Sequence, residues 1–215
     1  MTNFDFKKEY KEFYLPPRKP SIVNVPVANF IAVRGCGDPN KIDGAYKQSI
    51  GILYTLAFTL KMSYKTDYKI KDYQPYVVPP LEGFWWQDGA STFDYEDKDS
   101  FQWISAIRLP EFITRENLKW AKETASEKKG QDYSIAEFLT IEEGLCVQCM
   151  HIGEYDNTRI TIALMNEYLH NNGYEADITK DRHHHEIYLS DPRRCKAEKL
   201  RTVIRFPIKH TIPNL

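Results

Sequence analysis

The 215-residue sequence contains no apolar run that approaches the roughly 20 residues needed to cross a bilayer. Its first ten residues are charged and aromatic, and they lack the apolar centre of a signal peptide. The formal net charge is -1, so the chain lacks the strong positive field that attracts nucleic acids or anionic membranes. These absences predict a cytoplasmic protein that binds neither nucleic acid nor membranes.

Cysteine is also scarce, and the four residues are Cys36, Cys146, Cys149 and Cys195. So few cysteines in a chain of this length indicate reduced thiols rather than a disulfide framework. Cys146 and Cys149 lie in a predicted strand, where their spacing points the two thiols to opposite faces. That placement argues against a zinc knuckle or a redox pair.

Three consecutive histidines, His183, His184 and His185, are the strongest argument for a metal. In a strand His183 and His185 share one face and His184 lies on the other, whereas a zinc site needs three or four convergent ligands. The sequence also has neither a P-loop nor a GxGxxG motif. It therefore predicts no metal and no cofactor.

Aromatic residues are plentiful, at 13% of the chain, and 14 of them are tyrosines. Tyrosine combines an apolar ring with a polar tip, so this number favours half-wet surfaces such as pocket walls or interfaces. Residues 1–20 are charged and aromatic and end in a proline-rich stretch, which predicts an N-terminal arm. Residues 21–215 suit a single globular domain.

Periodicity predicts the elements of that domain. Strands are expected at 21–25, 28–34, 81–86, 101–109, 144–151, 184–190 and 200–208, and helices at 44–64, 114–129 and 158–172. The helix at 114–129 has the clearest boundaries, because Thr114 and Asn117 stand near its start and Gly130 follows its end. The helix at 44–64 is apolar on two sides, which predicts that neighbours cover both of them.

A strand-helix-strand-strand order occurs twice along the chain. The closing strands end alike, in Ile-Arg-Leu-Pro at 107–110 and Ile-Arg-Phe-Pro at 204–207. The strands before them begin with glutamate, as Glu82-Gly-Phe-Trp and Glu186-Ile-Tyr-Leu. The matches are weak enough to arise by chance, but they favour an internal duplication.

The predicted fold is therefore α+β, with duplicated strand-helix-strand-strand units related by pseudo-twofold symmetry around a central cleft. Unit one spans about 21–112 and unit two about 140–210, with an inserted helix at about 114–130. The helices are expected to cover one sheet face, while the opposite faces meet over the cleft. Clefts between repeats are common ligand sites.

Several segments resemble the GyrI-like small-molecule-binding family, namely Gly144 to Tyr155, Asn172-Gly173, and Glu186 to Leu189. The resemblance covers roughly Val23 to Ile208. It implies an acidic residue, here Glu186, at the base of an aromatic-lined pocket. No helix-turn-helix is recognisable before Val23, so the chain looks like the stand-alone branch, some members of which are described as hydrolases of cyclopropanoid toxins that use this glutamate.

Glu186 is the principal candidate from the residues themselves. Strand alternation places it on the same face as Tyr188, whose hydroxyl could donate a hydrogen bond to it or to a substrate. A half-buried carboxylate suits general acid-base chemistry or the binding of a cation, whereas a solvated strand glutamate would do neither. Glu186 and Tyr188 are thus the predicted catalytic residues.

Aromatic side chains and one histidine complete the predicted ligand site. Trp85 and Trp86 point to opposite faces, so at most one of them is expected to line the pocket, and Trp103 lies on the neighbouring strand. The remaining candidates are Tyr54 and Phe58 on the first long helix, His151 at a strand end, and Tyr155 in the following loop. For each of these the alternative is plain packing or, for His151, capping of the turn.

The leading hypothesis is a cofactor-independent enzyme that binds hydrophobic, aromatic, xenobiotic-like molecules and hydrolyses electrophilic ones. A non-catalytic protein that sequesters drugs is the alternative. A third hypothesis is an inhibitor that binds a protein partner such as a DNA gyrase, although no sequence feature specifically requires a partner.

Overall fold

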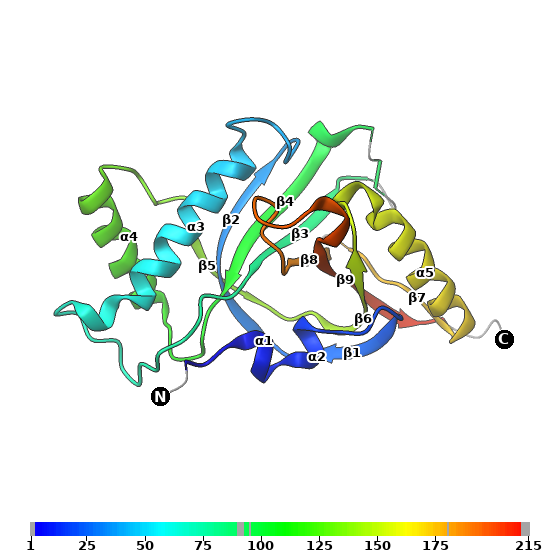
Figure 1. Ribbon diagram of the computed structural model, residues 1–215, viewed down its shortest axis with the longest axis horizontal. Coiled ribbons are helices and arrows are strands. Elements are labelled where there is room, and N and C mark those ends of the chain that lie inside the picture. The colour runs from blue at the N-terminus through cyan, green and yellow to red at the C-terminus, as the bar shows by residue number, and fades with distance from the viewer. Residues whose placement is uncertain (1–2, 90–92, 95, 180, 212–215) are drawn as a thin grey trace.

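The computed structural model describes residues 3–89, 93–94, 96–179 and 181–211 (Figure 1). Its helices are α1 Phe6–Glu9, α2 Lys11–Tyr14, α3 Ala45–Lys61, α4 Arg115–Lys129 and α5 Thr158–Asn171. Its strands are β1 Ser21–Val25, β2 Ala28–Cys36, β3 Leu81–Gln87, β4 Phe101–Arg108, β5 Glu137–Ile141, β6 Gly144–Ile152, β7 Tyr174–Ala176, β8 His184–Tyr188 and β9 Arg201–His210. The α+β class predicted from the sequence is confirmed.

The strands form one antiparallel sheet in the order β1-β6-β9-β8-β3-β4-β2-β5, and β7 pairs with the end of β9. The two predicted units meet where β3 pairs with β8. Counted outward from that junction, the strand order is the same in both halves, although the twofold relation itself stays a prediction. The units share one continuous sheet, and the central cleft between them stays a prediction.

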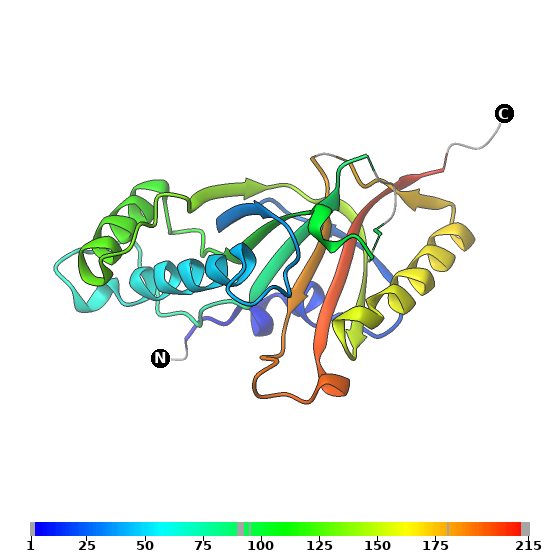
Figure 2. The same ribbon diagram turned by 90° about the horizontal axis from the view of Figure 1, so that it is seen from above.

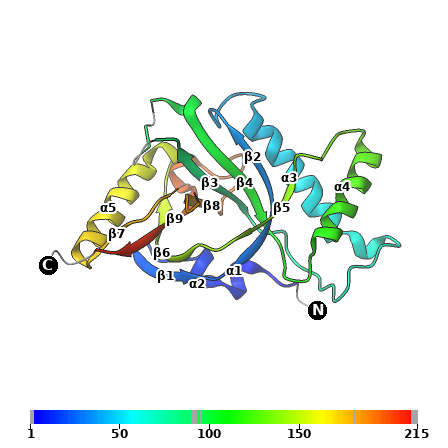
Figure 3. The same ribbon diagram turned by 180° about the vertical axis from the view of Figure 1, so that it is seen from behind.

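The outermost strand on each side belongs to the other half of the chain. β1 precedes β2 in sequence but pairs with β6, and β5 precedes β6 but pairs with β2. Figure 3 shows β5 at one side of the sheet running on into β6 near the other side. The two halves therefore exchange their edge strands.

Helices α3 and α5 cover the same face of the sheet, as predicted, and the loop between β8 and β9 extends on that side (Figure 2). α3 packs on β2 and β4 through Leu53, Leu56 and Leu60, all fully buried. α4 contacts α3 and covers its second apolar side. The expectation that α3 is covered on two sides is therefore confirmed. The candidate ligand site lies on this face of the sheet, between α3 and α5.

α4 begins and ends where its sequence predicts. The Thr114 hydroxyl accepts a hydrogen bond from the Asn117 backbone, and the Asn117 side chain accepts one from the Thr114 backbone, which forms a capping box. Gly130 ends the helix with φ at 65°, a left-handed conformation that glycine adopts without a steric penalty. These contacts satisfy backbone groups that a helix end otherwise leaves unpaired.

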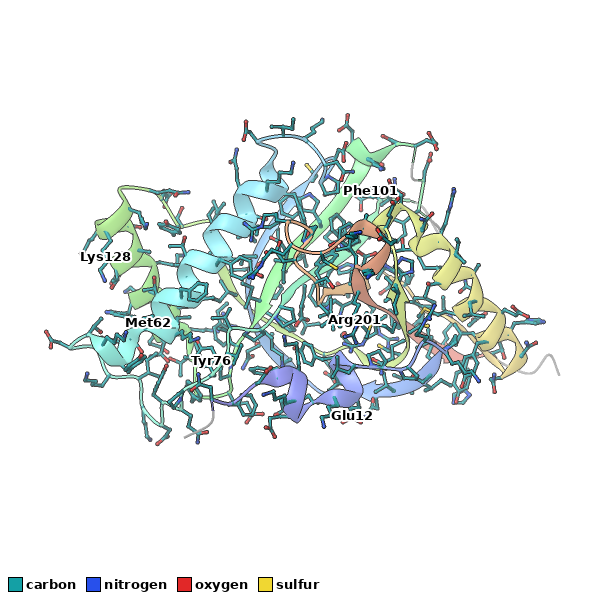
Figure 4. The ribbon with its side chains drawn as sticks, in the orientation of Figure 1. Glu12, Met62, Tyr76, Phe101, Lys128 and Arg201 are labelled. Carbon is teal, nitrogen blue, oxygen red and sulfur yellow. The ribbon has the colours of Figure 1, made fainter. Side chains whose placement is uncertain are left out.

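The N-terminal arm packs against the sheet face opposite α3 and α5. Phe6, Phe13 and Tyr14 are buried there against Ile187, Val203 and their neighbours. The arm is also held by polar contacts, since the Gln148 amide donates to the Glu12 carbonyl at 2.6 Å and Arg205 donates to the Phe13 carbonyl at 2.8 Å. Figure 4 labels Glu12 on this part of the chain.

A buried ionic network lies beneath the arm. His185 bonds through Nε2 to Glu82 and through Nδ1 to Glu143, each at 2.9 Å, and Arg205 donates to Glu143 at 3.0 Å. Tyr14 donates to the second oxygen of Glu82 at 2.9 Å. Burial alone would lower the pKa of His185, but the charges and hydrogen bonds of Glu143 and Glu82 outweigh it and raise that pKa.

The four cysteines are free thiols, with Cys146 and Cys149 buried on opposite faces of the sheet. Among the helices that the structure describes, none combines the length and the apolar character that crossing a membrane requires.

Candidate functional site

β8 presents different chemistry on its two faces. His184, Glu186 and Tyr188 point toward the side of α3 and α5, whereas His185 and Ile187 point toward the arm. The predicted alternation, with Glu186 and Tyr188 on one face and His184 beside them, is confirmed. Because side chains two residues apart in a strand are neighbours, these three groups form a row.

A chain of hydrogen bonds ends on the Glu186 carboxylate. The Trp85 indole donates to the Tyr188 hydroxyl at 3.0 Å, and that hydroxyl donates to Glu186 Oε2 at 2.8 Å. Burial, followed by the charge of Glu186, raises the pKa of Tyr188 well above its usual value. Tyr188 therefore stays protonated at physiological pH and acts as the donor to the carboxylate.

His184 occupies the other oxygen of the same carboxylate. Its Nε2 lies 3.1 Å from Glu186 Oε1, and its side chain is only 3% exposed, against 14% for Glu186. An ionised carboxylate only accepts hydrogen bonds, so Nε2 carries the hydrogen in this contact. Sequence reasoning missed this role, because it weighed His184 only as a metal ligand.

Aromatic rings surround this row of polar groups. Tyr46, at the start of α3, lies between Trp85 and Trp103, with ring centroids 5.0 Å and 5.1 Å away. Its buried hydroxyl forms no hydrogen bond of normal geometry with the described residues. Tyr155 meets Tyr188 edge to face at 5.5 Å, and burial together with the charge of Glu186 raises its pKa.

A glycine makes room for the hydrogen-bonded pair. Gly83 in β3 is the pairing partner of Glu186 in β8. A Cβ atom at Gly83 would lie 2.5 Å from the Trp85 indole nitrogen and 3.0 Å from the Tyr188 hydroxyl. The absence of a side chain at this position is therefore what allows Trp85 to reach Tyr188.

The loop between β8 and β9 borders the site. Burial raises the pKa of Tyr54, and the charges of Asp191 and Arg193 in this loop also act on it, so the loop lies near α3. Phe58 stacks on Tyr54 but is 50% exposed. Tyr54 and Tyr155 thus lie close to the loop on its two sides, whereas Phe58 lies mostly in solvent.

The structure brings Trp85, Trp103 and Tyr155 together around Glu186 and Tyr188, but not Trp86 or His151. Trp86 points to the opposite face, where it stacks on His183 with ring centroids 4.1 Å apart. His151 is buried at the end of β6 and bonds to Thr161 of α5 and to the Glu154 carbonyl. Its contacts are those of a residue that fixes the turn into α5.

The match of Glu82 with Glu186 as equivalent residues of the two units is wrong, because the two side chains point to opposite faces of the sheet. In the sheet Glu82 pairs with Ile187 and points toward the arm, where it joins the ionic network. The residue opposite Glu186 is Gly83. The two strands do divide polar and aromatic roles, but Trp85 is the aromatic partner of the glutamate, rather than Trp86.

A separate cavity lies on the arm-facing side of the sheet. Its volume is about 200 Å³ and its lining includes Phe84, Glu143, His183, His185 and Arg205. Glu143, His185 and Arg205 of this lining belong to the buried ionic network beneath the arm. Its position separates it from Glu186 by the thickness of the sheet.

The fold and the site together define a class of protein, an α+β domain that presents a half-buried carboxylate among aromatic rings. A carboxylate held by two donors can attract a cation or accept a proton, and the rings can pack against a flat apolar molecule. The chain belongs to the GyrI-like small molecule binding domain family, whose model matches residues 18–209.

Two solved structures support this assignment, and a third shares the fold. An uncharacterized conserved protein from Listeria innocua is 44% identical, with a TM-score of 0.91 over 96% of this chain and 100% of its own. A hydrolase from Listeria innocua is 43% identical, with a TM-score of 0.87 over 96% and 100% of the two chains. The EcmrR C-terminal domain is 13% identical, with a TM-score of 0.56 over 90% and 98%, and shares the fold alone. A search of curated proteins found no match.

Proposed function

We propose that this protein is a cofactor-independent hydrolase of hydrophobic electrophiles, with strained cyclopropanoid rings as the substrate class. The observation that carries the proposal is the Glu186 carboxylate, held by Tyr188 at 2.8 Å and His184 at 3.1 Å and only 14% exposed. Two Listeria relatives described as hydrolases, 43% and 44% identical, support a catalytic role.

Glu186 is the proposed general base. It removes a proton from water, and the water oxygen forms a bond to an electrophilic ring carbon. The strained carbon–carbon bond breaks, and its electron pair moves into the conjugated carbonyl of the substrate. Glu186 then returns the proton to that system, so that the net reaction adds one water molecule. Proton transfer by a positioned side chain contributes typically about 10²–10⁴-fold to a rate.

The aromatic rings supply binding and exclude water. Tyr155 presents a half-buried ring beside Tyr188, which suits a planar ring system, and the buried rings of Trp85 and Tyr46 support the site from the core. Tyr188 remains a phenol, because its pKa is raised, and it orients Glu186. Holding water and substrate at a fixed geometry lowers the entropic part of the barrier.

The test is turnover of a cyclopropane-bearing DNA alkylator, followed by its ultraviolet spectrum and by product mass. Wild-type protein is expected to give many turnovers and a product heavier by one water, and Glu186→Gln is expected to lose at least about 100-fold of kcat. Glu167→Gln, an exposed glutamate on α5, is the matched control and should retain full activity.

A binding-only domain gives a different result in the same experiment. It would quench tryptophan fluorescence at one ligand per protein and release no product. Full turnover by Glu186→Gln would refute the assignment of the base. Capture of a large enzyme partner without any ligand binding would favour an interaction protein instead.

A further inference from the structure

The environment of His184 distinguishes it from the other histidines of the chain. It is nearly buried and packs between Phe93, at 5.3 Å, and Phe206, at 6.3 Å, by ring centroids. Its pairing partner across the sheet is Trp85. Aromatic rings therefore surround the imidazole of His184, and its Nε2 bonds to the Glu186 carboxylate.

This packing fixes the direction of the imidazole. A ring that is enclosed by aromatic neighbours cannot rotate away without displacing them, because protein interiors are close-packed. Its Nε2 is therefore held 3.1 Å from Glu186 Oε1. Hydrogen bonds to charged groups are stronger than those between neutral groups, so this contact has a large effect on where the carboxylate lies.

The two donors constrain different oxygens of Glu186. Tyr188 bonds to Oε2 and His184 to Oε1, so rotation of the carboxylate about its last bond breaks both contacts. With only one of them, the carboxylate could turn its free oxygen away from the ligand. A general base must lie within about 2.6–3.2 Å of the proton that it removes, so such a rotation would stop the reaction.

We infer that His184 is a positioning residue for Glu186, which fixes the carboxylate in its reactive orientation without touching the substrate. The inference rests on the proposed function, because it assigns the rate to the orientation of Glu186. It also applies to binding, since a cationic ligand would meet the same carboxylate. Two measurements, of turnover and of ligand binding, separate a failure of the inference from a failure of the proposed function.

The first experiment is a double-mutant cycle on turnover with His184→Leu and Glu186→Gln. His184→Leu is expected to lower kcat at least about tenfold with little change in KM, and His184→Gln, which keeps a donor, is expected to recover most of that loss. Because His184 acts through Glu186, the double variant should be no slower than Glu186→Gln alone.

His151→Leu is the matched control, since it also removes a buried histidine that bonds to neighbouring groups, but one without contact to Glu186. It is expected to lower thermal stability, with an effect on kcat that is independent of Glu186→Gln. Independent, multiplicative effects of His184→Leu and Glu186→Gln would overturn the inference, and so would a failure of His184→Gln to recover any activity.

The second readout uses the planar cation ethidium, with quenching of tryptophan fluorescence as the signal. His184→Leu is expected to weaken binding about fivefold in the wild-type background and not at all in Glu186→Gln. If no cyclopropanoid compound is turned over, the proposed hydrolysis fails while this cycle still tests His184. Equal losses in both backgrounds would overturn the positioning role.

Discussion

Gly83→Ala should disrupt the candidate site by adding a single methyl group. The new Cβ would lie 2.5 Å from the Trp85 indole nitrogen and 3.0 Å from the Tyr188 hydroxyl, both closer than ordinary contacts. Overpacking of this kind costs about 1–3 kcal/mol. Loss of the Trp85–Tyr188 hydrogen bond adds about 0.5–1.5 kcal/mol. The expected decrease in the free energy of unfolding is therefore roughly 1.5–4.5 kcal/mol.

Urea denaturation followed by the fluorescence of the four tryptophans, Trp85 among them, measures this change. Gly51→Ala is the control, because a Cβ at this exposed glycine of α3 meets nothing within 4 Å. Alanine in a helix is more stable than glycine by about 0.5–1 kcal/mol, so this variant should gain stability. Gly83→Ala should also cost less in a Trp85→Phe background, since the conflict is with the indole.

A Gly83→Ala variant that unfolds at the wild-type urea concentration with unchanged fluorescence would refute this role of the glycine. A loss of stability that is the same with and without Trp85→Phe would also contradict it. In that case the backbone of β3 would require the glycine, and the hydrogen-bonded pair of Trp85 and Tyr188 would not.

Two further predictions concern other parts of the fold. Burial would raise the pKa of Glu143, but His185 and Arg205 outweigh burial and lower that pKa from 4.5 to about 2. The folded protein should therefore lose roughly 3 kcal/mol of stability as the pH falls from above 4.5 toward 2. Urea titrations at pH 5 and pH 2.5 test this, and a Glu143→Gln variant with the same pH dependence as wild type would contradict it. Thr114→Ala should cost about 0.5–2 kcal/mol through loss of the α4 cap, and Thr124→Ala, in the interior of the same helix, serves as its control in thermal denaturation. Equal melting temperatures for the two variants would refute the role of the cap.

The local signals in the sequence predicted much of this structure. The capping residues of α4 and the alternation in β8 depend on neighbours within a few positions, so they can be recognised from the chain alone. The same holds for the position of Glu186 beside Tyr188. β5 was missed, because a short strand at Glu137–Ile141 becomes evident only through its pairing with β2.

Residues were placed wrongly where their surroundings depend on contacts between parts of the chain that are distant in sequence. Similar letters aligned Glu82 with Glu186, but Glu82 pairs with Ile187 and faces the arm, whereas Glu186 faces α3 and α5. Strand alternation likewise places Trp85, and not Trp86, on the face of Tyr188. Tyr46 was overlooked because its distance from Trp85 in sequence gives no sign that α3 packs its first turn over the site.

The exchange of edge strands between the halves limits how this protein can be divided. A fragment ending before β5 would contain β1 without its partner β6, and β2 would lose its partner on one side. Unpaired strand edges favour pairing with other chains and hence aggregation. Neither half is thus expected to fold alone, but two separately produced halves should assemble by restoring both missing strands. The chain is accordingly suited to a split reporter, in which a change in tryptophan fluorescence signals that the halves have met.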